Sequence, residues 1–360
     1  MEVVMYEFIE RQHVTVELCL RTEDERLGII SRAVDLKSNE PLIVKPTILV
    51  LGGNKTKDVL VADSNAKCVE RFVGKCNEKY DILSVSYGMD YMLNKEKNAR
   101  TLCDKLFMPL VSEDGKRLHL DEAMKKMRRV NIFAHCAGAS RLNDILYSFK
   151  QSMDKLGYTS TEKSEILGQI SVVAYAPWSF INDRNIKKIY IQSIEDSVSP
   201  RVVERLYSIQ TKGDSSEYEF SHEELKVGAN ESYKIFLLRL YKTLMQEELV
   251  SYDSKGKNTL CYISKSQSKD YENFDHELKY IIRNNQFDLC DKSSTVADAV
   301  SLIVSESLLL TLSQSMINEN SKNVEKLYSL SHIKDVCDSV SSKTLKANKR
   351  PQDDFFSFLK

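Results

Sequence analysis

The spacing of hydrophobic and polar positions changes along the chain and outlines its elements. Alternation with a period of two over residues 13–20, followed by apolar and β-branched positions over 25–36, predicts an antiparallel strand pair. Continuous apolar runs at residues 46–53 and 81–90 contain or end in glycine turns, which is typical of strands buried on both faces. The N-terminal third therefore predicts four strands.

Helical spacing of apolar residues follows these strand-like runs. Helices are expected at residues 65–76, 121–129 and 140–157, and further strands at residues 130–136, 169–177, 187–196 and 259–264. Alternating strands and helices need crossover connections, and such connections place helices on both faces of a sheet. We therefore predict an α/β fold with a mostly parallel central sheet.

The second half of the chain differs in texture and sets the expected domain limits. We expect one α/β domain over residues 1–290, with a helical insertion at about 201–250 whose strongest helix spans residues 231–249. A C-terminal helical extension is expected at residues 291–341 and a tail at 342–360. The extra helices offer a surface to a protein partner.

Composition narrows the function classes. A net charge of -1 argues against nucleic-acid binding through bulk electrostatics. The 8 cysteines contain no CxxC pair, which argues against a zinc site or a dithiol redox motif, so reduced thiols and no metal or cofactor are expected. With only 12 glycines and 6 prolines, the chain is poor in the turns of an all-β fold.

The N-terminal residues and the most apolar later stretch bear on targeting and membrane insertion. Glu2, Glu7 and Glu10 lie in the first ten positions, where a secretory signal needs basic and then apolar residues. The most apolar later stretch, residues 296–312, contains Asp298 and Glu306 and is shorter than the roughly 20 residues that span a bilayer. We expect a cytoplasmic protein with no membrane span, and delivery into a host cell stays open as a context.

The stretch FAHCAGA, residues 133–139, lies between a predicted strand and a predicted helix. A nucleophile on a sharp strand-to-helix turn needs small residues two positions before and after it. Ala134 and Gly138 flank Cys136 in this way. Two interpretations are open, since free cysteine is also among the most buried residue types.

This stretch resembles the nucleophile elbow of the α/β-hydrolase superfamily, which commonly reads G-H-S-x-G-G. Here it reads A-H-C-A-G-A, with Cys136 in place of serine and Ala134 in place of the first glycine. The resemblance covers roughly residues 14–285 and implies an oxyanion hole in the LGGN turn. Its donors would be the backbone N–H groups of Asn54, which follows Gly53, and Ala137.

The resemblance also implies an acid and a base in the order nucleophile, acid, histidine. The acid is matched by Asp196 in DSVSP, although a helix N-cap is the structural alternative for that residue. The base is matched by His276 in NFDHEL, where Asp275 replaces the usual glycine. The separation, 276 - 196 = 80, requires the insertion, and His222 is the competing histidine.

The activity so implied is a hydrolase or acyltransferase that acts on an ester, thioester or amide through an acyl-cysteine intermediate. One alternative is a catalytically degenerate member that binds a small molecule or a protein. Another is a caspase-like cysteine peptidase, with a His-Gly turn about 50 residues before the cysteine. Tyr87 occupies that histidine position, 136 - 87 = 49 residues before Cys136, so this peptidase would lack its general base. A structural role is favoured for His135.

Overall fold

The computed structural model describes most of the chain up to Ser193 and shorter pieces beyond it. The described residues are 16–24, 28–37, 40–54, 56–73, 80–87, 94–193, 196, 204, 207–208, 210–211, 227–236, 239, 249–253, 259–264 and 308. Apart from residue 308, the expected C-terminal extension at 291–341 and the tail at 342–360 lie outside them.

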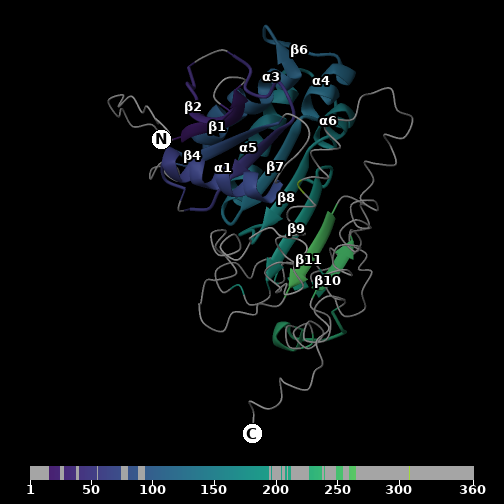
Figure 1. Cartoon of the computed structure of the whole chain (residues 1–360). Helices are drawn as coiled ribbons and strands as arrows, with labels where there is room; N and C mark the ends of the chain where they lie inside the picture. The colour runs from purple at the N-terminus through teal and green to yellow at the C-terminus, as the bar shows by residue number, and fades with distance from the viewer. Residues whose placement is uncertain are drawn as a thin grey trace, which may run out of the picture.

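A nine-stranded sheet in the order β10-β11-β9-β8-β7-β3-β4-β1-β2 organises the fold (Figure 1). Its strands are β1 (Val16–Asp24), β2 (Gly28–Ala33), β3 (Thr47–Leu51), β4 (Asp81–Tyr87), β7 (Val130–His135), β8 (Ser171–Tyr175), β9 (Lys187–Ser193), β10 (Leu249–Asp253) and β11 (Thr259–Ser264). The strands from β4 across to β11 run parallel, whereas β1, β2 and β10 are antiparallel to their neighbours. The predicted mostly parallel sheet and the N-terminal antiparallel pair are confirmed.

Helices cover both faces of this sheet, as the rhythm of the sequence predicts. The helical segments are α1 (Val59–Val73), α2 (Lys95–Leu102), η1 (Cys103–Phe107), α3 (Met108–Val111), α4 (Leu120–Met127), α5 (Gly138–Lys155) and α6 (Ser160–Leu167). On β1, Arg21 binds Glu70 of α1, while Leu18 and Leu20 belong to the core beneath α5. Since side chains alternate across a strand, α1 and α5 lie on opposite faces.

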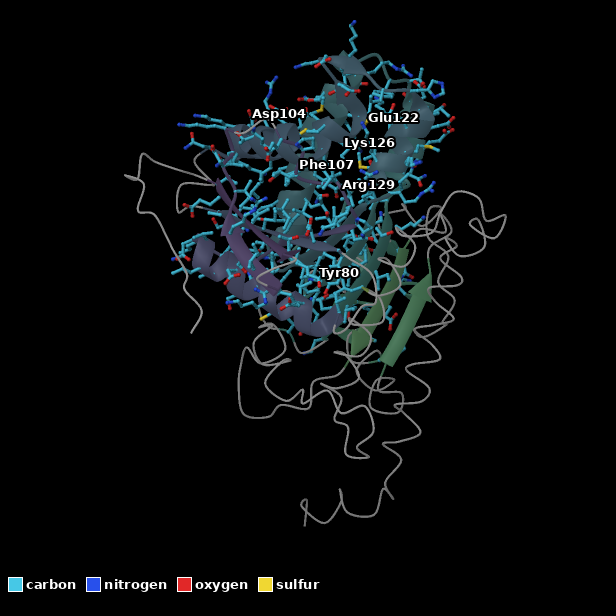
Figure 2. The ribbon with its side chains drawn as sticks, turned by 45° about the horizontal axis from the view of Figure 1, so that its top comes forward. Tyr80, Asp104, Phe107, Glu122, Lys126 and Arg129 are labelled. Atoms are coloured by element: carbon cyan, nitrogen blue, oxygen red, sulfur yellow. The ribbon has the colours of Figure 1, made fainter. Side chains whose placement is uncertain are left out.

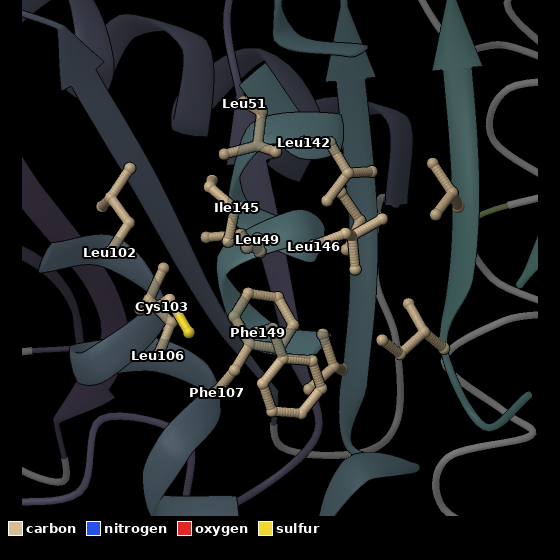
Figure 3. Packing of buried hydrophobic residues seen from close by; sticks show 14 of the residues in the cluster. Leu49, Leu51, Leu102, Cys103, Leu106, Phe107, Leu142, Ile145, Leu146 and Phe149 are labelled. Atoms are coloured by element: carbon tan, nitrogen blue, oxygen red, sulfur yellow. The ribbon is translucent and has the colours of Figure 1, made fainter. Parts of the chain in front are cut away.

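The core beneath α5 is built from its apolar stripe. Figure 3 shows Leu142, Ile145 and Phe149 of α5 directed toward strand β3 and the neighbouring helical turns. The rings of Phe107 and Phe149 lie 5.3 Å apart between centroids. This packing holds α5 against the sheet and thereby fixes the position of its first turn.

A π-helical turn interrupts the long helix that packs on α5. Pro109 has no N–H to donate, and its ring would collide with the carbonyl of Lys105 in a regular α-helix. The chain widens by one residue just before it, where the Met108 N–H bonds to the Cys103 carbonyl. Neither this helix nor its widened turn follows from the hydrophobic pattern.

Three further elements differ from the sequence-based expectations. The predicted helix at 231–249 ends earlier, because Leu249 begins strand β10, which pairs with β11. Helix α6 and the hairpin of β5 (Ser112–Glu113) and β6 (Lys116–Arg117) were not predicted.

Helix α4 presents Glu122 and Lys126 on its outer side, where they form an ion pair at 3.0 Å (Figure 2).

In the described segments, no helix combines the length and the apolar character that crossing a membrane requires.

Candidate functional site

The site is centred on the turn between β7 and α5. Strand β7 ends at His135, and Cys136 then adopts a φ of 53°, a left-handed conformation that few residues other than glycine take. Two bonds to the next crossover hold this conformation. The Cys136 N–H donates to the Tyr175 carbonyl at 3.2 Å, and the Cys136 carbonyl accepts from the Trp178 N–H at 2.9 Å.

Close contact between helix and sheet explains the small residues around this turn. A Cβ atom on Gly138 would lie 2.0 Å from the carbonyl oxygen of Leu51 on β3, well inside any allowed contact. Ala134, two residues before the cysteine, is fully buried. The steric demand predicted for the turn is therefore present in the structure.

The LGGN turn lies directly against the thiol. Strand β3 is the parallel neighbour of β7, and its last paired residue, Leu51, lies opposite Ala134. A Cβ on Gly53 would lie 3.1 Å from Cβ and 3.5 Å from Sγ of Cys136. A side chain at this position would therefore require the turn to shift away from Cys136 by a few tenths of an ångström.

Two backbone N–H groups near the thiol have no hydrogen-bond partner among the described residues. Neither the Asn54 N–H nor the Ala137 N–H forms a hydrogen bond with a described residue. Ala137 is only 5% exposed, and buried N–H groups are almost always paired in folded proteins.

Arg141 on α5 is a polar residue of this site that the sequence analysis missed. Its side chain is buried, and its Nη2 donates to Oδ1 of Asn54 at 2.9 Å. The guanidinium also lies 4.0 Å from the centroid of the Tyr87 ring. Helical spacing places Arg141 on the buried stripe that includes Gly138, Leu142 and Ile145, and a charge on such a stripe was the available signal.

The predicted acid lies at the same edge of the sheet as the thiol. Asp196 is buried, 3% exposed, three residues beyond Ser193 at the end of β9. Because β7, β8 and β9 run parallel, their carboxyl ends meet at one edge. Both candidate histidines, His276 and His222, lie outside the described residues.

The structure also shows the surroundings of the other residues that the sequence analysis considered. The His135 ring stacks on Tyr175, with centroids 5.9 Å apart. Tyr87, at the position that a caspase-like peptidase needs for histidine, is buried under Arg141. Cys136 is 7% exposed, and its thiol forms no hydrogen bond with a described residue.

Two other described thiols, Cys19 and Cys103, lie in the core away from the Cys136 turn. Burial, with the nearby Asp63 carboxylate second, raises the pKa of Cys19 to about 12. Burial likewise raises the pKa of Cys103 to about 12. Both thiols therefore stay protonated and unreactive at neutral pH. Within the described segments, no group of three metal-binding side chains gathers.

Comparison with protein-family models and with curated protein sequences finds no match.

Proposed function

We propose that the protein is a cysteine-dependent hydrolase or acyltransferase of the α/β-hydrolase type, acting on an ester, thioester or amide. The observation that carries the proposal is the conformation of Cys136. A non-glycine residue at a φ of 53° between a strand and a helix is strained, and such strain concentrates at functional sites. The adjacent donors of Asn54 and Ala137 add the second element of acyl-transfer chemistry.

The proposed reaction begins with the Cys136 thiolate. Its sulfur attacks the carbonyl carbon of the substrate, the S–C bond forms, and the carbonyl π electrons move onto the oxygen. The N–H groups of Asn54 and Ala137 stabilise that oxyanion. When the oxyanion collapses, the bond to the leaving group breaks, and the leaving group takes the proton that the histidine had accepted from the thiol. Water or an acceptor alcohol or amine then attacks the acyl carbon and gives its proton to the histidine, the S–C bond breaks, and the Cys136 sulfur leaves and is available again.

The parallel sheet supports His276 and Asp196 in this reaction. One strand, β8, separates the strand that ends in Cys136 from the strand that precedes Asp196. Neighbouring strands lie about 4.8 Å apart, so the two strand ends are separated by roughly 10 Å, a gap that one imidazole spans. Strand β11, which precedes His276, is parallel to β9 and ends at this edge too. We assign His276 as the base and Asp196 as the carboxylate that orients it.

A degenerate, non-catalytic binding protein is the second candidate. The low exposure of Cys136, 7%, favours it. In that case the strained turn would be a remnant of the scaffold, and the thiol would not be acylated.

The two candidates are separated by exposing the full chain to p-nitrophenyl acetate and locating the acetyl group by peptide mass spectrometry. The proposal predicts acetylation of Cys136 with release of p-nitrophenolate, and none at Cys19 or Cys103, whose pKa values of about 12 keep them protonated. Absence of acetyl on Cys136 in the folded protein would favour the binding protein.

Histidine variants test the base. His276→Ala is expected to slow acetylation of Cys136 by about 100-fold or more, since general-base catalysis contributes 10²–10⁴. His222→Ala is the matched control and is expected to leave the rate unchanged. If only His222→Ala slows acetylation, His222 is the base. If neither variant slows it, neither His276 nor His222 is the base.

A further inference from the structure

We infer that Arg141 is a positioning residue that holds the Gly53–Asn54 turn in place for oxyanion binding. The inference rests on the proposed function and adds a residue to it. Arg141 donates to the side chain of Asn54, whose own backbone N–H is one of the two proposed oxyanion donors. The guanidinium would thus act on the oxyanion through Asn54.

The Gly53–Asn54 turn needs such a support because its own side chains make few contacts that would hold it in place. Asn54 is exposed, and its N–H has no hydrogen-bond partner among the described residues. The rest of the turn is anchored behind it, where the Thr56 N–H donates to the Gly53 carbonyl at 3.1 Å and the Tyr87 N–H donates to the Thr56 carbonyl at 2.8 Å. The bond from Arg141 at 2.9 Å holds the remaining, outer side of the turn.

Contacts from two elements hold Arg141 in place, as a positioning residue requires. Its backbone N–H donates to the Ala137 carbonyl at 3.1 Å, so Arg141 lies one helical turn after the second proposed oxyanion donor. The Tyr87 ring supports the guanidinium from β4. Arginine presents a planar group that stacks and donates at the same time, and lysine cannot reproduce this. One side chain therefore connects α5, β4 and the Gly53–Asn54 turn.

The test compares two reactions of the same thiol in the full chain. Acetylation by p-nitrophenyl acetate passes through an oxyanion, whereas alkylation by iodoacetamide forms the S–C bond as iodide leaves, with no oxyanion. Arg141→Met and Asn54→Ala are each expected to slow acetylation about 10- to 100-fold, because misplaced groups lose that much. Both are expected to leave alkylation within about threefold. Arg141→Lys should behave like Arg141→Met.

Additivity gives a second measure. If Arg141 acts through Asn54, the double variant is expected to be no slower in acetylation than the worse single variant. Asn54 is exposed, so Asn54→Ala keeps the test valid even if Arg141→Met folds poorly. Arg117→Met is the matched control, because Arg117 also stacks on a tyrosine, 4.4 Å from the Tyr158 centroid, but lies on the β5–β6 hairpin. It is expected to change neither reaction.

Each other result has a distinct meaning. Equal loss of acetylation and alkylation in the variants, or a shifted pH profile of alkylation, would show that Arg141 acts on the thiol or on the fold, and would overturn the inference. Unchanged acetylation in both single variants would overturn it as well. Failure of the unmodified protein to acetylate Cys136 would instead count against the proposed function.

Discussion

At the scale of single residues, the site depends on the backbone conformation of Cys136 and on the close approach of Gly53. Cys136 has a left-handed φ of 53°, which costs on the order of 1–3 kcal/mol for a residue with a Cβ. Its backbone bonds to Tyr175 and Trp178 hold it in that conformation. Gly53 lets the turn after β3 approach the sulfur, so the backbone of the Gly53–Asn54 turn lies directly beside Cys136.

Gly53→Ala tests this close approach. The added Cβ would lie 3.1 Å from the Cβ of Cys136, so the turn must shift away by a few tenths of an ångström. We expect acetylation of Cys136 to slow roughly 10-fold and the free energy of unfolding to fall by only about 1 kcal/mol. Stopped-flow release of p-nitrophenolate and urea denaturation measure the two effects.

The control for this change is Gly228→Ala, where the new Cβ meets its nearest neighbours at 3.6 and 3.7 Å, an ordinary contact. It is expected to alter neither quantity. If Gly53→Ala acetylates as fast as the unmodified protein, the Gly53–Asn54 turn does not take part in the reaction.

Some features of single residues could be predicted from the sequence, and others could not. The sharp turn at Cys136 was predictable, because small residues at fixed offsets are a local requirement. The bond from Arg141 to Asn54 was not, because the partners are 87 positions apart and meet only when α5 docks on β3. The roles of His276 and Asp196 stay predictions.

At the scale of elements, the first turn of α5 is held by a backbone contact with β3. Alanine stabilises a helix interior by about 1 kcal/mol relative to glycine, so an ordinary helical glycine gains from replacement. Gly138→Ala is expected to do the opposite and lower the free energy of unfolding by at least about 2 kcal/mol, because the Cβ would lie 2.0 Å from the Leu51 carbonyl. Urea denaturation gives the sign, and a stabilised variant would contradict the contact.

The start of α6 carries a charge pair that makes stability depend on pH. A hydrogen bond from the Arg117 guanidinium has the largest effect on Glu162, and hydrogen bonds with Thr159 come next. Together they lower the pKa of Glu162 to about 2 from its usual 4.5. A lowered pKa in the folded state gives stability above pH 4.5, and this contribution disappears as the pH falls toward 2. Glu162→Gln should therefore lower the urea midpoint at pH 7 and progressively less between pH 4.5 and 2.

Glu122→Gln is the control for this prediction. Glu122 pairs with Lys126 one turn along α4, an exposed arrangement that contributes little. Its midpoint is expected to stay near that of the unmodified protein at every pH. A difference for Glu162→Gln that is constant from pH 7 to pH 2 would show that the carboxylate charge is irrelevant there.

Sequence patterns predicted the strands better than the connections between them. Buried parallel strands are continuous apolar runs, so β3, β4, β7 and β8 were recognisable. The helix with the widened turn at η1 depends on how Pro109 is accommodated, and β10 exists through its pairing with β11. Both are consequences of tertiary structure that override a local pattern.

At the scale of the whole molecule, the parallel sheet gives its two edges different roles. Strand β9 has a buried aspartate near each end, with Asp183 four residues before it and Asp196 three residues after it. Asp183 lies at the amino edge, where it forms an ion pair with Lys150. Asp196 lies at the carboxyl edge that it shares with Cys136. The topology therefore predicts that only one of them acts in catalysis.

Replacing each aspartate by asparagine tests this division. Asp196→Asn is expected to slow turnover of the acyl-cysteine by about 10²–10⁴, the loss expected when a base loses its orienting carboxylate. Asp183→Asn breaks an ion pair whose lysine is 41% exposed, so about 1–2 kcal/mol of stability should be lost, with turnover per folded molecule unchanged. Turnover of p-nitrophenyl acetate, normalised to the folded fraction by circular dichroism, measures both. Equal turnover in Asp196→Asn and the unmodified protein would leave Asp196 a helix cap, whereas loss in both variants would mean that sheet distortion, not edge position, controls the site.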